Sequence, residues 1–216
     1  VKGVGRGAVE TIIEHRKEGK YSSIFDLTQR IDLRAANKKA LENLTLAGGM
    51  DSFGNTHRAQ YFNPDGDGIT FLEKAIRYGA KHQESLNSSQ TNLFGEDSAL
   101  QVEEIKIPPC DSWGTLERLK QEKEVVGIYL SAHPLDDFKR EMKHFSSAPL
   151  TVLSDLDPLI NRELSFGGIV NGVDHRIARN GKGWAIFQLE DFDDQYEFKI
   201  FGEEYLKYRH FLMPNG

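Results

Sequence analysis

The sequence predicts an α+β protein in which an all-helical first part is followed by a short antiparallel β region. Three observations predict this class. Apolar residues recur at helical spacing up to about residue 145, and the spacing changes to that of strands after Pro149. The pair Asn180-Gly181 then predicts a hairpin that joins two strands. We expect two domains, 1–147 and 148–216.

The composition excludes several classes of protein. Hydrophobic residues make up 38% and charged residues 28% of the chain, as in a globular protein, and no apolar run approaches the roughly 18 residues that a membrane span needs. The single cysteine, Cys110, excludes an internal disulfide and is typical of the cytoplasm. The N-terminal residues VKGVGRGAVE contain neither a start Met nor a signal peptide, so we expect a piece of a longer chain.

The charge is unevenly distributed along the chain. The net charge is −6, which argues against strong nonspecific binding to DNA. Residues 1–60, however, contain 10 Lys/Arg and 7 Asp/Glu, whereas residues 61–216 contain 17 and 26. The N-terminal part is therefore the better electrostatic candidate for contact with nucleic acid.

The first 61 residues predict four short helices. The apolar face of the first consists of Ala8, Val9, Ile12 and Ile13. Ser23 and Asn37 are placed to cap the second and the third. Residues 55–61 predict the fourth.

Three longer helical segments follow. One covers about residues 70–85, and the polar stretch 87–104 after it is predicted to be an exposed loop. Another begins after Pro109, and its predicted inward side chains are Trp113, Leu116, Leu119, Val126 and Leu130. The last starts at Pro134 and carries Leu135, Phe138, Met142 and Phe145.

The β region predicts the opening of an OB-type barrel. A long strand over 163–177, kinked at Gly167–Gly168, is followed by strands over 184–189 and 196–201 and by a helix over 203–211. A complete barrel of this type has five strands, so we expect a partial, C-terminally truncated barrel.

The segment Lys2-Gly3-Val4-Gly5-Arg6-Gly7-Ala8 is the first candidate site. A Gly-x-Gly turn that opens a helix presents backbone N–H groups at the positive end of the helix, and such groups hold a phosphate without recognising a base. The segment resembles the second half of a helix-hairpin-helix motif. The candidate DNA-binding residues are Lys2, Gly3, Gly5, Arg6 and Gly7. The alternative is an ordinary tight turn, and we interpret the second glycine turn, 48–54, mainly as structural.

The polar loop contains a second candidate, Gln90-Thr91-Asn92-Leu93-Phe94. A short peptide whose Leu and Phe fill a preformed pocket, while its Gln bonds at the rim, is an economical recognition element. The pattern Gln-x-x-Leu-Phe resembles the motif by which bacterial proteins bind the ring-shaped sliding clamp. In the alternative, Leu93 and Phe94 pack onto their own domain.

The β region is the third candidate, because aromatic and basic residues accompany its strands. The candidate DNA-binding residues here are His175, Arg176, Arg179, Lys182 and Trp184. The alternative is that the aromatic residues only pack the core. Asp191, Asp193 and Asp194 would repel phosphate, so we expect weak binding.

No catalytic residue or metal site is predicted. Asn63–Gly68 resembles the start of an EF-hand loop, but the twelfth position is Lys74 rather than Glu, so a turn before a helix is the better interpretation. His133-Pro134-Leu135-Asp136 fits a helix junction. Neither a catalytic carboxylate pair, a Cys–His pair, a nucleophile elbow nor zinc-ligand spacing is found in the sequence.

Four blocks in order resemble the bacterial replicative DNA polymerase III alpha subunit family. They are KGVGRGAVETIIEHRKEGKYSSIFDL, NKKALENLTLAGGMDSFG, LERLKQEKEVVGIYLSAHPLDDF and LSFGGIVNGV with NGKGWAIFQLEDFDDQYEFKIFGEEY. QTNLF lies between the second and third, where the family keeps its clamp-binding motif. The resemblance implies binding of the sliding clamp (the beta subunit) by Gln90, Leu93 and Phe94, and contact with duplex DNA and single-stranded template.

The same resemblance implies a parent enzyme that extends DNA with magnesium and deoxynucleotides. Its catalytic aspartates belong to a palm domain that has no match here, so no cofactor is expected in this chain. The segments that recruit other holoenzyme subunits also have no match. We expect a cytoplasmic protein without a membrane partner.

Other classes remain open from the residues alone. A DNA repair nuclease or ligase combines such modules but needs a metal-carboxylate cluster or a nucleophilic lysine, and neither is evident. A calcium-binding scaffold and an RNA-binding barrel are further alternatives.

Overall fold

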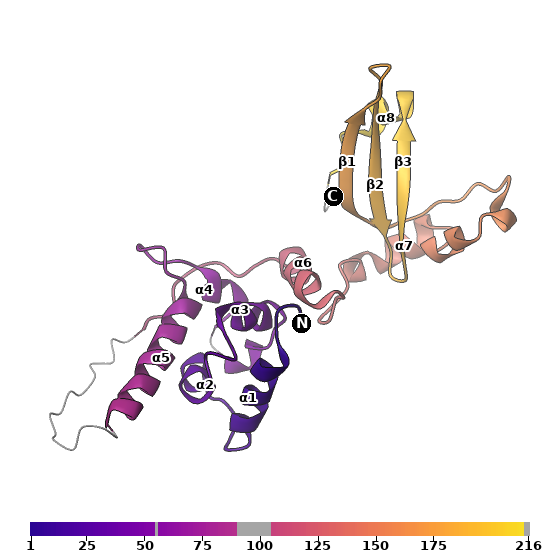
Figure 1. The fold of residues 1–216 in the computed structure, drawn as a ribbon. Coiled ribbons are helices and arrows are strands. Elements are labelled where there is room, and N and C mark those ends of the chain that lie inside the picture. Colours follow the sequence, from indigo (N-terminus) through magenta and orange to yellow (C-terminus); the bar gives the residue numbers. More distant parts are fainter. Residues whose placement is uncertain (55, 90–104, 214–216) are drawn as a thin grey trace. The chain divides into compact units, whose positions relative to one another are not determined.

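The computed structural model describes residues 1–54, 56–89 and 105–213, apart from the side chains of residues 87–89. The chain forms two units, Val1–Ser131 and Ala132–Gly216, and each has its own core (Figure 1). The boundary predicted from the sequence, after residue 147, falls inside the second unit.

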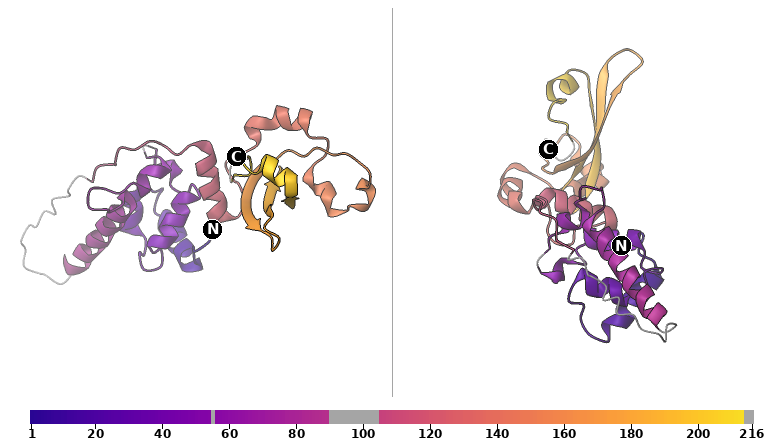
Figure 2. Two further views of the ribbon diagram at one scale, coloured as in Figure 1. Left: turned by 90° about the horizontal axis from the view of Figure 1, so that it is seen from above. Right: turned by 90° about the vertical axis from the view of Figure 1, so that its left-hand side faces the viewer.

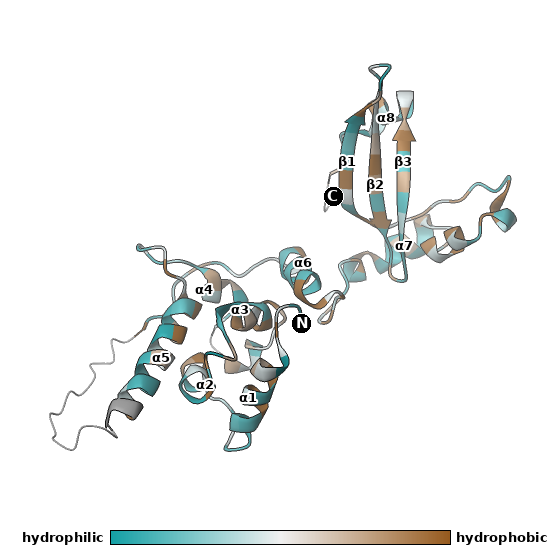
Figure 3. Ribbon diagram, viewed as in Figure 1, coloured by the Kyte–Doolittle hydropathy of each residue, from teal (hydrophilic) through white to brown (hydrophobic). Residues whose placement is uncertain are grey.

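The first unit is helical, as predicted. Its helices are α1 (Arg6–Arg16), α2 (Ile24–Arg30), α3 (Lys38–Leu46), α4 (Arg58–Phe62), α5 (Phe71–Ser89) and α6 (Thr115–Val126), with a 3-10 turn at Asp51–Phe53. Figure 3 shows apolar and polar segments alternating along α5, as one buried face requires.

Local capping explains where the helices start. The Ser23 hydroxyl accepts a hydrogen bond from the N–H of Asp26 at 3.2 Å, and the Asn37 side chain accepts one from Ala40 at 3.0 Å. Both predicted caps are therefore confirmed. Thr70 and Glu73 bond reciprocally at the start of α5, with the Thr70 N–H donating to the Glu73 carboxylate at 2.9 Å.

The core of the first unit draws on α1 to α5, and its most extensive helix packing is between α2 and α5. Gly79 lies so close to Thr28 that a Cβ there would be 2.4 Å from the Thr28 carbonyl oxygen, so only glycine allows this approach. The Thr28 hydroxyl donates to the Ala75 carbonyl at 3.0 Å. Gln83 Nε2 donates to the carbonyl oxygens of Thr28 and Ile31 at 2.9 and 2.8 Å, which satisfies acceptors at the end of α2.

Two predicted helix faces are wrong in part. Val9 and Ile13 of α1 are 42% and 46% exposed, because no described element covers that side of the helix. Leu116 and Leu130 are also exposed. α6 ends at Gly127, whose φ of +95° lies in the left-handed region, so Leu130 follows the helix and does not continue its buried stripe.

The second unit combines an open sheet with short helices. The helical segments are a 3-10 turn at Asp136–Phe138, α7 (Lys139–Phe145), 3-10 turns at Leu150–Ser154 and Asp157–Leu159, and α8 (Gly202–Tyr208). Phe138 and Phe145 are exposed, whereas Leu135 is buried. The strands are β1 (Ile169–Ile177), β2 (Gly183–Glu190) and β3 (Gln195–Phe201).

The three strands form an antiparallel sheet in the order β1-β2-β3 (Figures 1 and 2). The predicted hairpin is confirmed: the N–H of Ala178 donates to the Lys182 carbonyl at 2.9 Å and β1 pairs with β2. β1 begins at Ile169 rather than at residue 163, directly after the two glycines. The α+β class is therefore confirmed, and the described strands form an open, partly barrel-like sheet.

One face of the sheet forms the core of the second unit. Ala185 is fully buried beside Tyr205 of α8 and Leu212. On the same face, the rings of Phe187 and Phe198 stack with their centroids 5.5 Å apart. α8 therefore covers this face, and on the opposite face the described side chains are exposed or half-buried.

No helix in the described part of the chain is long and apolar enough to cross a membrane.

Candidate nucleic-acid interface

The glycine loop before α1 is held by two other helices. The N–H of Lys2 donates to the Val125 carbonyl of α6 at 2.7 Å, and Asn43 of α3 donates to the Lys2 carbonyl at 2.6 Å. Gly3 has a φ of +71°, and a Cβ there would be 2.9 Å from the Asn43 amide nitrogen. The loop therefore has a fixed conformation that requires glycine at position 3.

The N-terminus of α1 has the features of an anion site. Gly5 is the N-cap and supplies no side-chain cap, and the first turn contains no acidic residue. The first N–H groups of an α-helix have no partner within the helix, and the helix dipole is positive at this end. A Cβ on Gly5 would have no heavy atom within 4 Å, so the approach to these groups is open.

Two basic side chains, Arg6 and Lys39, lie near this helix end, and each pairs with a glutamate, Glu10 and Glu42. The Arg6 side chain is 91% exposed and pairs with Glu10 at 2.6 Å. Lys39, which the sequence analysis did not select, lies beside Gly3: its Cγ would be 3.8 Å from a Cβ there. The signal that could have identified it is a pair of lysines in the first turn of α3, where acidic residues are usual. Gly7 instead faces Ala35 at 3.7 Å, which is ordinary packing.

The second glycine turn is built around a buried arginine. Arg58 is 7% exposed; its Nε and Nη2 donate to the Asp51 carboxylate at 2.9 and 2.7 Å, and its Nη1 donates to the Leu46 carbonyl at 3.0 Å. The hydrogen bond that Arg58 donates to Asp51 raises the pKa of Arg58 above its ordinary value. Since these contacts close the chain after α3, the structural interpretation of this turn is supported.

The segment that resembles an EF-hand closes on itself. One oxygen of Asp65 accepts hydrogen bonds from the N–H groups of Asp67 and Ile69, each at 2.9 Å, and the other pairs with Lys74 at 2.5 Å. The bond from Lys74, followed by the backbone bonds, lowers the pKa of Asp65 to about 2. The oxygens of Asp65 are thus engaged in a turn that leads into α5.

The solvent face of the sheet carries a row of stackable side chains. Arg176, Trp184 and Phe201 are aligned across β1, β2 and β3. The Trp184 and Phe201 rings stack with centroids 5.3 Å apart and planes at 15°, and the Arg176 guanidinium lies 5.5 Å from the Trp184 ring centroid. Phe201 is 56% exposed, so a flat apolar surface is open to the solvent.

The charges on this face are balanced. Asp174 pairs with Arg176 at 2.6 Å, and Glu197 pairs with Lys199 at 3.5 Å. The face therefore offers planar groups for stacking but no uncompensated positive charge.

The other predicted residues of the β region lie elsewhere. His175 is on the face that α8 covers, and its Nδ1 lies 3.2 Å from the Tyr205 hydroxyl. Arg179 and Lys182 are exposed at the hairpin between β1 and β2. The fold therefore separates His175 from the Arg176–Trp184 pair, while the two hairpin cations adjoin the end of the stacked row.

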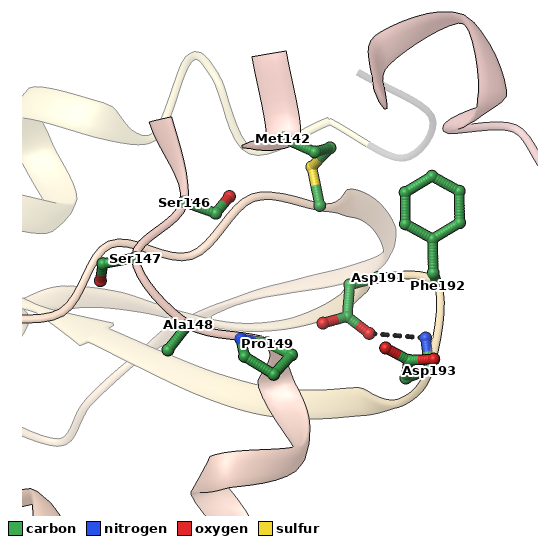
Figure 4. Close-up of a pocket in the computed structure, with 8 residues that line it drawn as sticks. All are labelled: Met142, Ser146, Ser147, Ala148, Pro149, Asp191, Phe192 and Asp193. Atoms are coloured by element: carbon green, nitrogen blue, oxygen red, sulfur yellow. Dashed lines mark hydrogen bonds between the residues drawn. The ribbon is translucent and has the colours of Figure 1, made fainter. Parts of the chain in front are cut away.

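Asp191 does not act as the surface charge that the sequence suggested. It is 5% exposed, and its carboxylate accepts hydrogen bonds from the N–H groups of Leu150 (2.6 Å), Asp193 (2.9 Å) and Asp194 (2.8 Å). Figure 4 shows the Asp191 carboxylate turned toward the backbone N–H of Asp193. Burial alone raises its pKa, but the three backbone bonds outweigh burial and lower the pKa below its ordinary value.

Two further predictions concern the clamp motif and the absence of a metal site. Gln90, Leu93 and Phe94 lie outside the described residues. Among residues 1–54, 56–89 and 105–213, no group of three or more His, Cys, Asp and Glu side chains is arranged to hold a metal ion.

Comparison with known proteins agrees with this arrangement. A family model described as "Helix-hairpin-helix motif" matches residues 1–61, which include the glycine loop and α1 to α3. Residues 1–61 are thus of the helix-hairpin-helix class.

The similar curated proteins are all the same subunit of a bacterial DNA polymerase. DNA polymerase III subunit alpha of Borreliella burgdorferi is 32% identical over 220 residues, covering 100% of this chain and 18% of the relative. The subunit of Saccharopolyspora erythraea is 31% identical (95% of the chain, 17% of the relative), and that of Vibrio cholerae is 29% identical (98% and 18%). The resemblance stated from the sequence is therefore confirmed, and this chain spans less than a fifth of the length of these relatives.

Proposed function

We propose that this chain is the DNA-binding and sliding-clamp-binding portion of a replicative DNA polymerase, in which it confers processivity and positions DNA in the cytoplasm. The observation that carries the proposal is the similarity to DNA polymerase III subunit alpha over 95–100% of the chain, together with the helix-hairpin-helix match. The activity of the whole protein, with magnesium and deoxynucleotides, is part of the same proposal.

The glycine loop supports binding to the backbone of duplex DNA. The N–H groups at the start of α1 would donate hydrogen bonds to a phosphate oxygen, and Lys2, Arg6 and Lys39 would supply positive charge near it. Such a contact is independent of base sequence, which suits a polymerase that must move along its template.

The sheet supports a weaker contact with single-stranded template. Bases stack on exposed aromatic rings irrespective of sequence, and the row of Arg176, Trp184 and Phe201 provides such a surface. Because its charges are balanced, we expect stacking rather than phosphate attraction to provide the affinity. The hairpin residues Arg179 and Lys182 would bind the phosphates beyond the row. In this proposal the β region is part of an OB-type barrel.

The motif Gln90, Leu93 and Phe94 would tether the polymerase to the sliding clamp. A clamp that encircles the duplex keeps a bound polymerase near the primer end, and a short flexible link gives an effective concentration of about millimolar. Weak contacts at the glycine loop and at the sheet are then sufficient for long runs of synthesis.

The decisive experiment measures binding of the chain to the sliding clamp by calorimetry or surface plasmon resonance. The wild-type chain should bind with a micromolar or lower Kd, and the double substitution Leu93→Ala/Phe94→Ala should abolish binding. Asn92→Ala in the same loop is the matched control, because the motif leaves this position free. Absence of wild-type binding, or equal binding by the double variant, would refute the tethering role and leave only the nucleic-acid contacts.

A further inference from the structure

The glycine loop is fixed by one buried side chain and one backbone carbonyl. The side chain is Asn43 of α3, which is 4% exposed and donates from its amide to the Lys2 carbonyl at 2.6 Å. The carbonyl is that of Val125 in the last turn of α6, and it accepts from the Lys2 N–H at 2.7 Å. Both backbone polar groups of Lys2 are therefore bound, and the chain is held in place immediately before Gly3.

Asn43 also packs against the residue that makes the turn. The φ of Gly3 is +71°, and a Cβ on Gly3 would lie 2.9 Å from the Asn43 amide nitrogen. Because a buried amide costs free energy unless it is hydrogen-bonded, the contact with Lys2 is what allows Asn43 at this position. A single side chain thus binds Lys2, packs against Gly3 and sets the turn by which the chain enters α1.

The direction of the first N–H groups of α1 depends on this turn. Gly5 is the N-cap of the helix and supplies no side-chain cap. The N–H groups of Arg6 and Gly7 have no acceptor within the helix, because they belong to its first turn. Only Val4 and Gly5 separate them from Gly3, so a different turn at Gly3 would change where these N–H groups lie relative to the loop.

α3 presents two residues to the loop from one face of the helix. Lys39 and Asn43 are four residues apart, and residues at this spacing lie one above the other on a helix. Both approach Gly3, but Lys39 is exposed whereas Asn43 is buried. Lys39 is therefore placed to meet a ligand itself, and Asn43 acts on the ligand only through the conformation of the loop.

We propose that Asn43 is the positioning residue of the glycine loop: together with the Val125 carbonyl, it holds Lys2 and Gly3 so that the N–H groups at the start of α1 face a DNA phosphate. The inference rests on the proposed function of the loop and adds a residue that does not touch DNA. It also makes α6 part of the site, because Val125 lies outside the segment 1–61 that matches the helix-hairpin-helix motif.

The test measures binding of the chain to a labelled DNA duplex by anisotropy over a series of salt concentrations. Asn43→Leu removes the donor with little change in size. It should weaken binding about tenfold and reduce the slope of log K against log salt concentration by about 0.9, as expected for one lost phosphate contact. Thr45→Val is the matched control: Thr45 is fully buried on the same helix, and its hydroxyl donates to the Leu41 carbonyl at 2.8 Å. Each variant loses one buried hydrogen bond, so a merely structural role predicts equal effects, whereas we expect Thr45→Val to bind as the wild type does.

Amide hydrogen exchange reports on the loop without DNA, and its first part does not depend on how a variant folds. In the wild-type chain the Lys2 N–H should exchange at least about tenfold more slowly than in an unfolded peptide, because its acceptor is fixed in α6. Asn43→Leu should remove this protection, and Thr45→Val should retain it.

Arg6→Gln distinguishes failure of the inference from failure of the proposed function, because it removes an exposed charge at the helix start and leaves the anchors of the loop intact. If Arg6→Gln weakens DNA binding and Asn43→Leu does not, the positioning role is refuted while the DNA contact stands. If the wild type does not bind duplex, or neither variant changes binding, the loop is not a DNA contact and both ideas fail. Free exchange of the Lys2 N–H in the wild type, or equal losses of affinity in the Asn43 and Thr45 variants, also overturns the positioning role.

Discussion

Replacing Asp191 with asparagine should lower the free energy of unfolding of the second unit by about 2–4 kcal/mol. In the structure one carboxylate oxygen accepts from Asp193 and Asp194, and the other accepts from Leu150. Asparagine keeps one acceptor oxygen but turns an amide toward the N–H of Leu150. One buried donor then loses its partner, which costs about 1–3 kcal/mol, and the two remaining bonds lose their charge assistance.

Urea unfolding followed by Trp184 fluorescence measures this effect. A Trp113→Phe background removes the tryptophan of the first unit, so that the signal reports the sheet. Asp193→Asn is the matched control: its side chain is exposed, and we expect a change within about 0.5 kcal/mol. Equal stabilities of the Asp191 and Asp193 variants would refute the reasoning, because they would show that the backbone bonds to Asp191 contribute nothing.

The same variant changes the response to acid. The folded-state pKa of Asp191 lies below its ordinary value of 3.8, so its stabilisation is present above the unfolded-state pKa and is lost as the pH falls through the folded-state pKa. We expect the wild-type sheet to lose stability below about pH 4 more steeply than Asp191→Asn does. Parallel curves would show that Asp191 does not contribute to acid unfolding.

Three further substitutions test other parts of the structure. Gly3→Ala forces a φ of +71° on a residue with a Cβ, so it should lower the free energy of unfolding in urea by about 1–2 kcal/mol. Gly5→Ala should lower it by less than about 1 kcal/mol, and a reversed order would contradict the loop geometry. Gly79→Ala should cost about 1–3 kcal/mol or more, because its Cβ meets backbone; a thermal melt unchanged from wild type would contradict this close packing. Trp184→Ala should weaken binding of a labelled single-stranded oligonucleotide by about 1–3 kcal/mol in anisotropy titrations, with Tyr208→Ala as an aromatic control; equal losses would remove the stacking role.

Features that depend on neighbouring residues were predictable from the sequence. The caps Ser23 and Asn37 act on N–H groups three residues away, and the Asn-Gly hairpin sets the pairing of β1 with β2. Features that depend on distant partners were not. Whether Val9 and Ile13 are covered depends on which element packs against α1, and helical spacing contains no such information.

The candidate sites divide in the same way. The glycine loop at the start of α1 was predictable because a turn before a helix is local, but Lys39 comes near the loop only through the packing of α3. The role of Asp191 was wrong for a related reason. Three acids in a polar turn suggest a charged surface. The backbone N–H groups of that turn need an acceptor, however, and the Asp191 carboxylate is buried because it accepts their hydrogen bonds.

The arrangement of contacts explains why no single one needs to be strong. Under the proposed function, a polymerase that advances along DNA must release each phosphate, so binding through backbone N–H groups at the loop and stacking at the sheet would both suit repeated, sequence-independent contact. Affinity concentrated in either would slow movement. Placing affinity in the clamp motif instead, as we propose, keeps the enzyme near DNA without fixing it at one position, because the ring slides. The net charge of −6 fits this division, since a strongly basic chain would bind duplex DNA tightly without a clamp.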